Sequence, residues 1–191
     1  MTDTASWLKT INREVEAEDT DAGRSRSVLL RRSFAAPVED VWDALTNPTR
    51  LKRWFYPVTG DLRAGGKYQL EGNAGGEIRT CDKPNLLVLT WEYDGGGSSD
   101  LVVRLSPEGD GSTVVDLKHT AVLPFDDDIW VANLGGFAPG WDHGFSRLDA
   151  YLRGELAEDD SPTELSPEAQ QLWELSGQEW TAVATAWRNN S

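Results

Sequence analysis

The sequence has few of the residues that build disulfide frameworks and metal sites: one cysteine and two histidines in 191 residues. The single cysteine, Cys81, excludes an internal disulfide framework and a cysteine-based zinc site. The histidines, His119 and His143, do not form the helical pair that is typical of a transition-metal site. We therefore expect no bound metal ion and no cofactor.

Long apolar runs and an excess of basic charge are also missing. No apolar run approaches the roughly 20 residues that a membrane-spanning helix needs. Residues 1–20 lack the basic start and apolar stretch of a secretory signal. The net charge of −14 disfavours binding to nucleic acid and to anionic membrane surfaces, since both require a basic face. A cytoplasmic protein without nucleic-acid or membrane partners is the simplest interpretation.

The acidic residues are concentrated in the two ends of the chain. Residues 1–25 contain six acidic and three basic side chains, and residues 155–191 contain eight and one. We expect the first segment to be an N-terminal helix with an acidic linker and the last to be an acidic linker followed by a C-terminal helix. Residues 26–154 are expected to form the folded domain between them.

Within the first segment, apolar residues at helical spacing predict a short helix over residues 5–17, followed by a polar linker. The residues expected on its buried side are Trp7, Leu8, Ile11 and Val15.

The middle of the chain changes from helical to strand periodicity. Residues 26–34 predict a strand, and residues 36–48 and 49–55 predict two short helices. Five segments with period-two alternation follow, separated by hairpin-length turns rich in glycine, so they are expected to form an antiparallel meander. These segments are GGKYQLEG, GEIRTC, NLLVLTWEYD, SDLVVRLSPEG and STVVDLKHTAV.

Residues 140–156 predict a long helix with one apolar stripe, which we expect to cover the dry face of the sheet. The stripe contains Trp141, Phe145, Leu148 and Leu152. The opposite side, expected to face solvent, carries Asp142, Arg147, Asp149 and Arg153. His143 is expected at the helix edge or in solvent. The predicted fold class is α+β, a curved antiparallel sheet wrapped around a long helix, with extra helical segments at both ends.

This order of elements resembles the helix-grip fold of the START-like, or Bet v 1-like (SRPBCC), superfamily. It resembles most the branch related to the C-terminal domain of the activator of Hsp90 ATPase. The resemblance spans about residues 26–154 and implies an apolar cavity between sheet and helix, but no single chemistry. The segments that carry it are RRSFAAPVEDVWDALTNPTRLKRWFYP, DLRAGGKYQLEG, PNLLVLTWEY, VVRLSPEGDGSTVVDLKHTAVL and GWDHGFSRLDAYLRG.

Aromatic side chains around this expected cavity are candidates for ligand binding, with ordinary core packing as the alternative. His119 shares the inward face of its strand, where it could orient a ligand, act as an acid or base, or be satisfied by a backbone or tyrosine partner. The candidate residues are Trp54, Phe55, Tyr68, Trp91, Tyr93, His119, Phe137, Trp141 and Phe145.

We expect the protein to bind a small hydrophobic or amphipathic ligand, such as a lipid, an aromatic compound or a polyketide-like metabolite. One alternative is a cyclase or hydrolase that uses the same cavity with His119 as acid or base. Another, implied by the resemblance, is a partner of an Hsp90-type chaperone. Whether the protein is an enzyme is left open.

Two further segments need an explanation. The run of three carboxylates at residues 125–130 lacks the ligand spacing and glycine turn of a calcium loop, so we expect a solvated loop. The helix expected near the C-terminus carries Trp173, Trp180 and Trp187 at seven-residue intervals. Such a stripe must be covered, either by docking on its own domain or by a homodimer.

Overall fold

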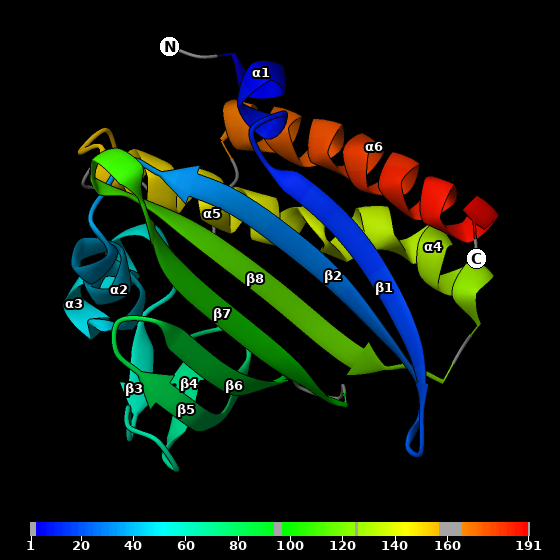
Figure 1. Ribbon diagram of the computed structural model, residues 1–191, viewed down its shortest axis with the longest axis horizontal. Coiled ribbons are helices and arrows are strands. Elements are labelled where there is room, and N and C mark those ends of the chain that lie inside the picture. The colour runs from blue at the N-terminus through cyan, green and yellow to red at the C-terminus, as the bar shows by residue number, and fades with distance from the viewer. Residues whose placement is uncertain (1–2, 94–96, 125, 157–165, 191) are drawn as a thin grey trace.

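The computed structural model describes residues 3–93, 97–124, 126–156 and 166–190. A curved antiparallel sheet wraps around two consecutive helices, and a further long helix lies over the outside of them (Figure 1). This is the α+β helix-grip arrangement expected from the sequence.

The sheet has the strand order β1-β2-β8-β7-β6-β5-β4-β3, with every neighbouring pair antiparallel. The predicted opening strand is β2, and the predicted meander is β4 to β8. The three-residue strand β3 was not predicted, because it is too short for a period-two pattern. The strands are β1 (Asn12–Thr20), β2 (Gly23–Phe34), β3 (Val58–Gly60), β4 (Lys67–Leu70), β5 (Gly75–Asp82), β6 (Leu86–Glu92), β7 (Ser98–Glu108) and β8 (Ser112–Val122).

Two helices, α4 and α5, follow each other along the concave side of the sheet, and α6 crosses over them (Figure 1). The short helices α2 and α3 close one end of the sheet. The helices are α1 (Thr4–Leu8), α2 (Val38–Thr46), α3 (Pro48–Trp54), α4 (Asp127–Phe137), α5 (Pro139–Leu152) and α6 (Pro167–Asn190), and the 3-10 turn η1 (Gly109–Gly111) joins β7 to β8.

The predicted helix over residues 5–17 is wrong beyond its first turns. The helix ends at Leu8, and the chain continues as β1, which pairs with β2 in the register Val15 opposite Val28. The expected polar linker is therefore mostly a β-hairpin. The sequence NREVEAEDT alternates acidic and apolar residues, and this period-two signal matches the alternating burial of the strand.

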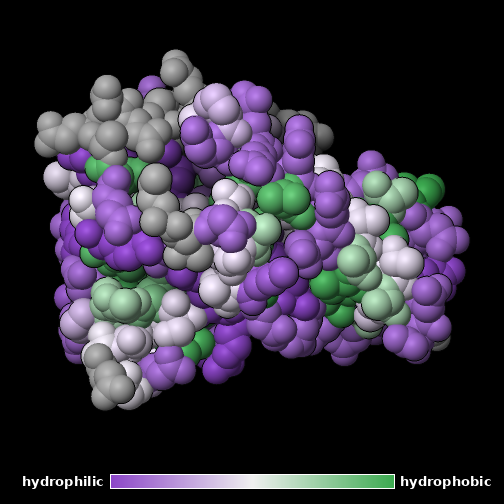
Figure 2. Space-filling view, turned by 90° about the horizontal axis from the view of Figure 1, so that it is seen from above, coloured by the Kyte–Doolittle hydropathy of each residue, from purple (hydrophilic) through white to green (hydrophobic). Residues whose placement is uncertain are grey.

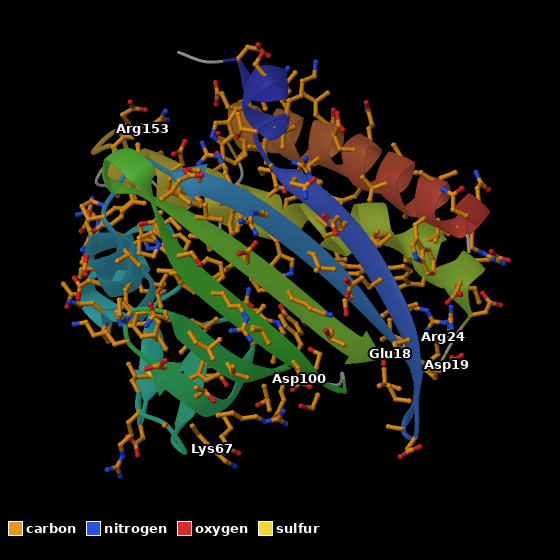
Figure 3. The ribbon with its side chains drawn as sticks, in the orientation of Figure 1. Glu18, Asp19, Arg24, Lys67, Asp100 and Arg153 are labelled. Carbon is orange, nitrogen blue, oxygen red and sulfur yellow. The ribbon has the colours of Figure 1, made fainter. Side chains whose placement is uncertain are left out.

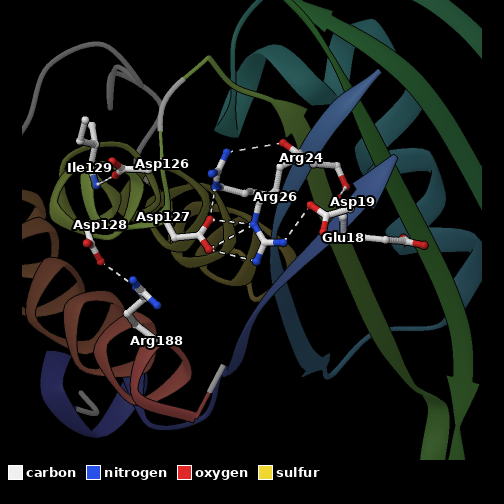
Figure 4. Close-up of polar contacts among 10 residues, drawn as sticks. Glu18, Asp19, Arg24, Arg26, Asp126, Asp127, Asp128, Ile129 and Arg188 are labelled. Carbon is white, nitrogen blue, oxygen red and sulfur yellow. Dashed lines mark hydrogen bonds and ion pairs between the residues drawn. The ribbon is translucent and has the colours of Figure 1, made fainter. Parts of the chain in front are cut away.

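The expected solvated loop at residues 125–130 is also wrong, apart from residue 125, which lies outside the described residues. Asp126 caps α4 by accepting a hydrogen bond from a backbone N–H in its first turn. Asp127 binds two arginines of β2, and Asp128 pairs with Arg188 of α6 at 2.6 Å (Figure 4). The three carboxylates begin a helix and attach it to its neighbours.

Asp127 ties the start of α4 to the β1–β2 hairpin. Its carboxylate lies 2.7 Å from Arg26 Nε and 3.0 Å from Arg24 Nη2 (Figure 4). Hydrogen bonds from Arg24 and then Arg26 hold the pKa of Asp127 below its ordinary value, since they stabilise the charged carboxylate. Because Arg26 is buried, this pair is shielded from solvent.

The outer side of α5 does not face solvent as predicted. Asp142, Arg147 and Asp149 are buried. Of the four residues only Arg153, at the end of the helix and labelled in Figure 3, is exposed. The reason is that elements from both ends of the chain cover this side of α5. Helical periodicity identifies a charged face, but it does not show what packs against that face.

Asp142 is fully buried and accepts hydrogen bonds from residues of two other elements. Its Oδ2 atom accepts hydrogen bonds from Arg13 Nε of β1 at 3.1 Å, from Trp180 Nε1 of α6 at 2.9 Å, and from the Ser176 hydroxyl. Burial raises the pKa of Asp142, and the charge of Arg13 opposes that shift. The carboxylate thus joins α5 to β1 and to α6.

Asp149, two turns further along α5, binds the N-terminal part of the chain in the same way. Its carboxylate pairs with Arg32 of β2 at 3.0 Å and accepts a hydrogen bond from Trp7 Nε1 at 2.9 Å. The guanidinium of Arg32 also stacks over the Trp7 ring, 4.8 Å from its centroid. The N-terminal helix is therefore docked through a buried polar layer.

Helix α6 docks on its own chain, which is the first of the two predicted alternatives; a homodimer is not shown. Trp180 is completely buried, and Trp187 contacts Trp130 of α4 edge-on, with ring centroids 5.5 Å apart. Gly177 permits a close crossing, since a Cβ there would lie 3.1 Å from the carbonyl oxygen of Gly135 in α4. The molecular face seen from above in Figure 2 is mostly hydrophilic.

We predict that Asp142→Ala strongly destabilises the protein, lowering the free energy of unfolding by about 3–5 kcal/mol, because it leaves the Arg13 guanidinium buried without its carboxylate. Asp128→Ala is the matched control: it also removes an aspartate–arginine contact to α6, but an exposed one, and should cost no more than about 1 kcal/mol. Urea denaturation measures both. Equal losses would contradict a central role for the buried pair.

Candidate ligand-binding site

A cavity of about 140 Å³ lies between the concave face of the sheet and α5. Its walls are almost entirely apolar side chains from the meander strands and from the inward stripe of α5. Residues that line it include Tyr68, Ile78, Leu101, Val103, Leu117 and Phe145. We call this space the inner compartment.

A second space, of about 290 Å³, adjoins the first where α4 meets α5. We call it the outer compartment. Trp54, Phe55, Trp91, Trp141 and Gly144 line both spaces, so the two compartments share a wall. The half-exposed side chains that line only the outer compartment include Tyr93 and Phe137, which are 55% and 45% exposed.

Two of the lining aromatic residues are held by hydrogen bonds to the backbone. The Tyr68 hydroxyl donates to the carbonyl oxygen of Thr90 at 2.8 Å, and Trp54 Nε1 donates to the carbonyl oxygen of Ala44 at 3.0 Å. Burial raises the pKa of Tyr68, so its phenol stays protonated. Both residues therefore present ring surface to the cavity while their polar atoms are satisfied.

Trp91, His119 and Trp141 form an aromatic cluster at the shared wall. Their ring centroids lie 5.1 Å apart for Trp91 and Trp141, 5.4 Å for His119 and Trp141, and 6.1 Å for Trp91 and His119. The cluster joins β6, β8 and the first turn of α5. It brings together residues that are 50 positions apart along the chain, from Trp91 to Trp141.

The hydrogen bonds of this cluster fix the tautomer of His119. Trp141 Nε1–H can only donate, and it donates to His119 Nδ1 at 3.2 Å. The proton of the neutral ring must then lie on Nε2, which donates to Ser99 Oγ at 2.8 Å. The Ser99 hydroxyl donates in turn to the carbonyl oxygen of Trp91 at 2.9 Å.

His119 is neutral at physiological pH. Burial lowers the pKa of His119 to about 4, while the charge of Asp100 on β7 (Figure 3) acts in the opposite direction. Of the three predicted roles, a satisfied imidazole matches these contacts, although its partners are Trp141 and Ser99 rather than a backbone group or a tyrosine.

The outer compartment also contains groups that were not predicted to line it. Arg147 lies against its wall and donates from Nε to the carbonyl oxygen of Trp54 at 2.8 Å. Trp173 and His143 face each other across the α5–α6 contact, with ring centroids 6.4 Å apart. Arg147 was assigned to solvent, and the tryptophan stripe was recognised but not connected with the site.

A family model described as "Activator of Hsp90 ATPase homolog 1-like protein" (AHSA1) matches residues 35–153. The chain belongs to the AHSA1 family. This confirms the resemblance drawn from the sequence.

Two solved structures of CalU16 from Micromonospora echinospora are similar over nearly the whole chain. The crystal structure is 33% identical and covers 91% of this chain and 98% of CalU16, with a TM-score of 0.75. The solution structure is 34% identical and covers 92% and 96%, with a TM-score of 0.77. Because this coverage exceeds that of the AHSA1 model, the likeness includes the flanking segments.

DynU16, described as a putative protein in the dynemicin biosynthetic locus, is a more distant structural neighbour. It is 21% identical, covers 70% of this chain and 50% of DynU16, and has a TM-score of 0.59, which shows a shared fold. No curated protein matches the chain significantly.

In this AHSA1 protein, the structure brings all nine candidate residues to the walls of the two compartments. Seven line the outer compartment, and Tyr68 and Phe145 line the inner one. Gly144, which lines both compartments, was not among the predicted residues. Its position on the inward side of α5, three residues after Trp141, could have identified it. Whether the nine residues bind a ligand stays a prediction.

The residues that the structure describes contain neither a membrane-spanning helix nor a cluster of metal-binding side chains. No helix there is long and apolar enough to cross a bilayer. Within the same residues, no three histidine, cysteine, aspartate or glutamate side chains gather as a metal site would require.

We predict that the stability contributed by neutral His119 is lost in acid. Because the folded-state pKa lies below the ordinary 6.5, the unfolded chain binds more protons between pH 6.5 and about 4, and stability falls as the pH drops through this window. The stability difference between the wild type and His119→Phe should shrink by on the order of 3 kcal/mol from neutral pH to pH 4. Urea denaturation at several pH values measures it, and a constant difference would contradict the prediction.

Proposed function

We propose that the protein binds a small hydrophobic or amphipathic molecule in the two adjoining compartments. The observation that carries this proposal is a largely apolar internal cavity that adjoins an aromatic outer compartment. Together, their volumes fall in the range of roughly 300–1,000 Å³ that is usual for small-molecule sites. Apolar walls favour a ligand over water, since buried water needs polar partners.

The size of the inner compartment selects among the predicted ligand classes. At about 140 Å³ it is close to the engineered apolar cavity of about 150 Å³ in another protein that accepts benzene. A single ring or a short branched chain fits such a space, whereas a fused polycycle does not. An aromatic compound, or a polyketide-like metabolite that ends in a ring, is therefore favoured over a long-chain lipid.

The family and one structural neighbour also support this proposal. The AHSA1 fold supplies the sheet and helix between which such cavities form. DynU16 belongs to a biosynthetic locus for dynemicin, which agrees with a small-molecule ligand, although its likeness to this chain concerns the fold.

The other predicted functions have less support. A cyclase or hydrolase with His119 as acid or base is disfavoured because burial lowers the pKa of His119 to about 4, so the imidazole is a weak base and is not protonated at neutral pH. A chaperone partnership rests on the family name alone. We also propose that the protein acts in the cytoplasm, on the strength of its composition.

Gly144 offers a direct test, because it lines both compartments. A Cβ atom added there would meet only Phe55 Cε2, at 3.7 Å, so alanine is accommodated without backbone strain. Gly144→Ala should raise the free energy of unfolding by up to about 1 kcal/mol, since glycine is a poor helix former. Gly144→Leu should fill the space where the two compartments meet. The two rings of biphenyl would occupy both compartments, so this substitution should weaken biphenyl binding by more than about tenfold.

Tryptophan fluorescence titrations with toluene and biphenyl measure the binding. Gly136→Ala and Gly136→Leu are matched controls, because Gly136 also lies in a helix but a Cβ there would meet nothing within 4 Å. Native mass spectrometry after incubation with a lipid and metabolite extract would identify natural ligands. The proposal fails if neither probe binds the wild type, or if Gly144→Leu binds biphenyl as tightly as Gly136→Leu does.

A further inference from the structure

His119, which lines the outer compartment, lies beside the wall shared by the two compartments and accepts a hydrogen bond there. Its ring contacts Trp91 and Trp141, two of the five residues that form this wall. A ligand that extends from the inner into the outer compartment must pass this cluster. The hydrogen-bonding character of His119 therefore bears on which ligands are accepted.

Ser99, which lines neither compartment, fixes the hydrogen-bonding character of His119. Ser99 lies opposite Trp91 in the β6–β7 register, and its hydroxyl proton is used by the carbonyl oxygen of Trp91. Ser99 Oγ can therefore only accept from the imidazole, which holds the proton on Nε2. Nδ1 of His119, whose partner Trp141 lines both compartments, is left as an acceptor.

The hydrogen bond that Nδ1 accepts from Trp141 is the easiest of the three in the cluster to replace. The Trp141 indole N–H lies 3.2 Å from Nδ1, which is longer than the 2.8 Å and 2.9 Å of the other two hydrogen bonds. Trp141 is only partly buried, and Gly144, its neighbour on the next turn of α5, has no side chain that could pack against it.

We propose that the bound molecule is a ring compound with a hydroxyl or N–H group, and that this group donates its hydrogen to His119 Nδ1 in place of the Trp141 indole. This inference rests on the proposed function and narrows it. Phenols and related donor-bearing rings are accepted. A ligand that places only a carbonyl, ether or carboxylate oxygen there meets the lone pair of Nδ1 and is disfavoured, because a buried acceptor would be left unpaired.

The test compares three probes of similar shape: phenol, which donates; toluene, which has no polar group; and benzaldehyde, which only accepts. Affinities are measured by calorimetry for the wild type and for His119→Phe. The phenol-to-toluene affinity ratio should fall by about tenfold in His119→Phe, because the acceptor is gone. The benzaldehyde-to-toluene ratio should not fall.

Two further measurements separate hydrogen bonding from packing. In NMR spectra of labelled protein, the Trp141 indole N–H signal, assigned with Trp141→Phe, should move on addition of phenol by more than on addition of toluene. Ser99→Ala leaves the cavity wall intact but removes the acceptor that holds the proton on Nε2 of His119, so it should lower the phenol-to-toluene affinity ratio by a smaller factor. If His119→Phe does not fold, Ser99→Ala serves as the test variant in its place.

The possible outcomes separate the two proposals. If the probes bind but the phenol-to-toluene ratio is the same in the wild type and both variants, the donor requirement is overturned and the ligand-binding proposal stands. If none of the three probes binds the wild type, both fail.

Discussion

The buried contact between Asp142 and Arg13 determines how the rest of the molecule is assembled. A carboxylate with no exposed surface in the first turn of α5 needs donors from elsewhere, and it receives them from β1 and α6. The segments on both sides of the AHSA1 domain thereby become part of its structure. With its outer side held in this way, α5 presents Trp141 and Phe145 to the sheet, where the two compartments form.

The AHSA1 domain was predictable where local pattern and burial agree. The meander strands alternate polar and apolar residues and are separated by glycine-rich turns, so their pairing followed from the sequence. Strand β1 was missed because four apolar residues from Trp7 to Val15 also match a helix. Helix α4 was missed because three aspartates in succession are typical of a loop, and their arginine partners lie far away in the sequence.

The candidate site was predictable in its residue types but not in its internal contacts. The aromatic residues that line the compartments lie on the inward faces of strands and helices, and periodicity identifies those faces. The tautomer of His119 depends on Ser99, which is 20 residues away in sequence and adjacent only through strand pairing. The outer side of α5 was misassigned for a related reason, since its covering elements come from both ends of the chain.

Strand β1 also affects whether copies of the protein associate with one another. An open sheet ends in backbone groups that could pair with another chain, and this strand lies at one such edge. Glu14, Glu16 and Glu18 stand at alternate positions along it, and two similar edges brought together would bring these like charges close to one another. The acidity of the N-terminal segment thus serves colloidal stability by opposing intermolecular β-sheet growth.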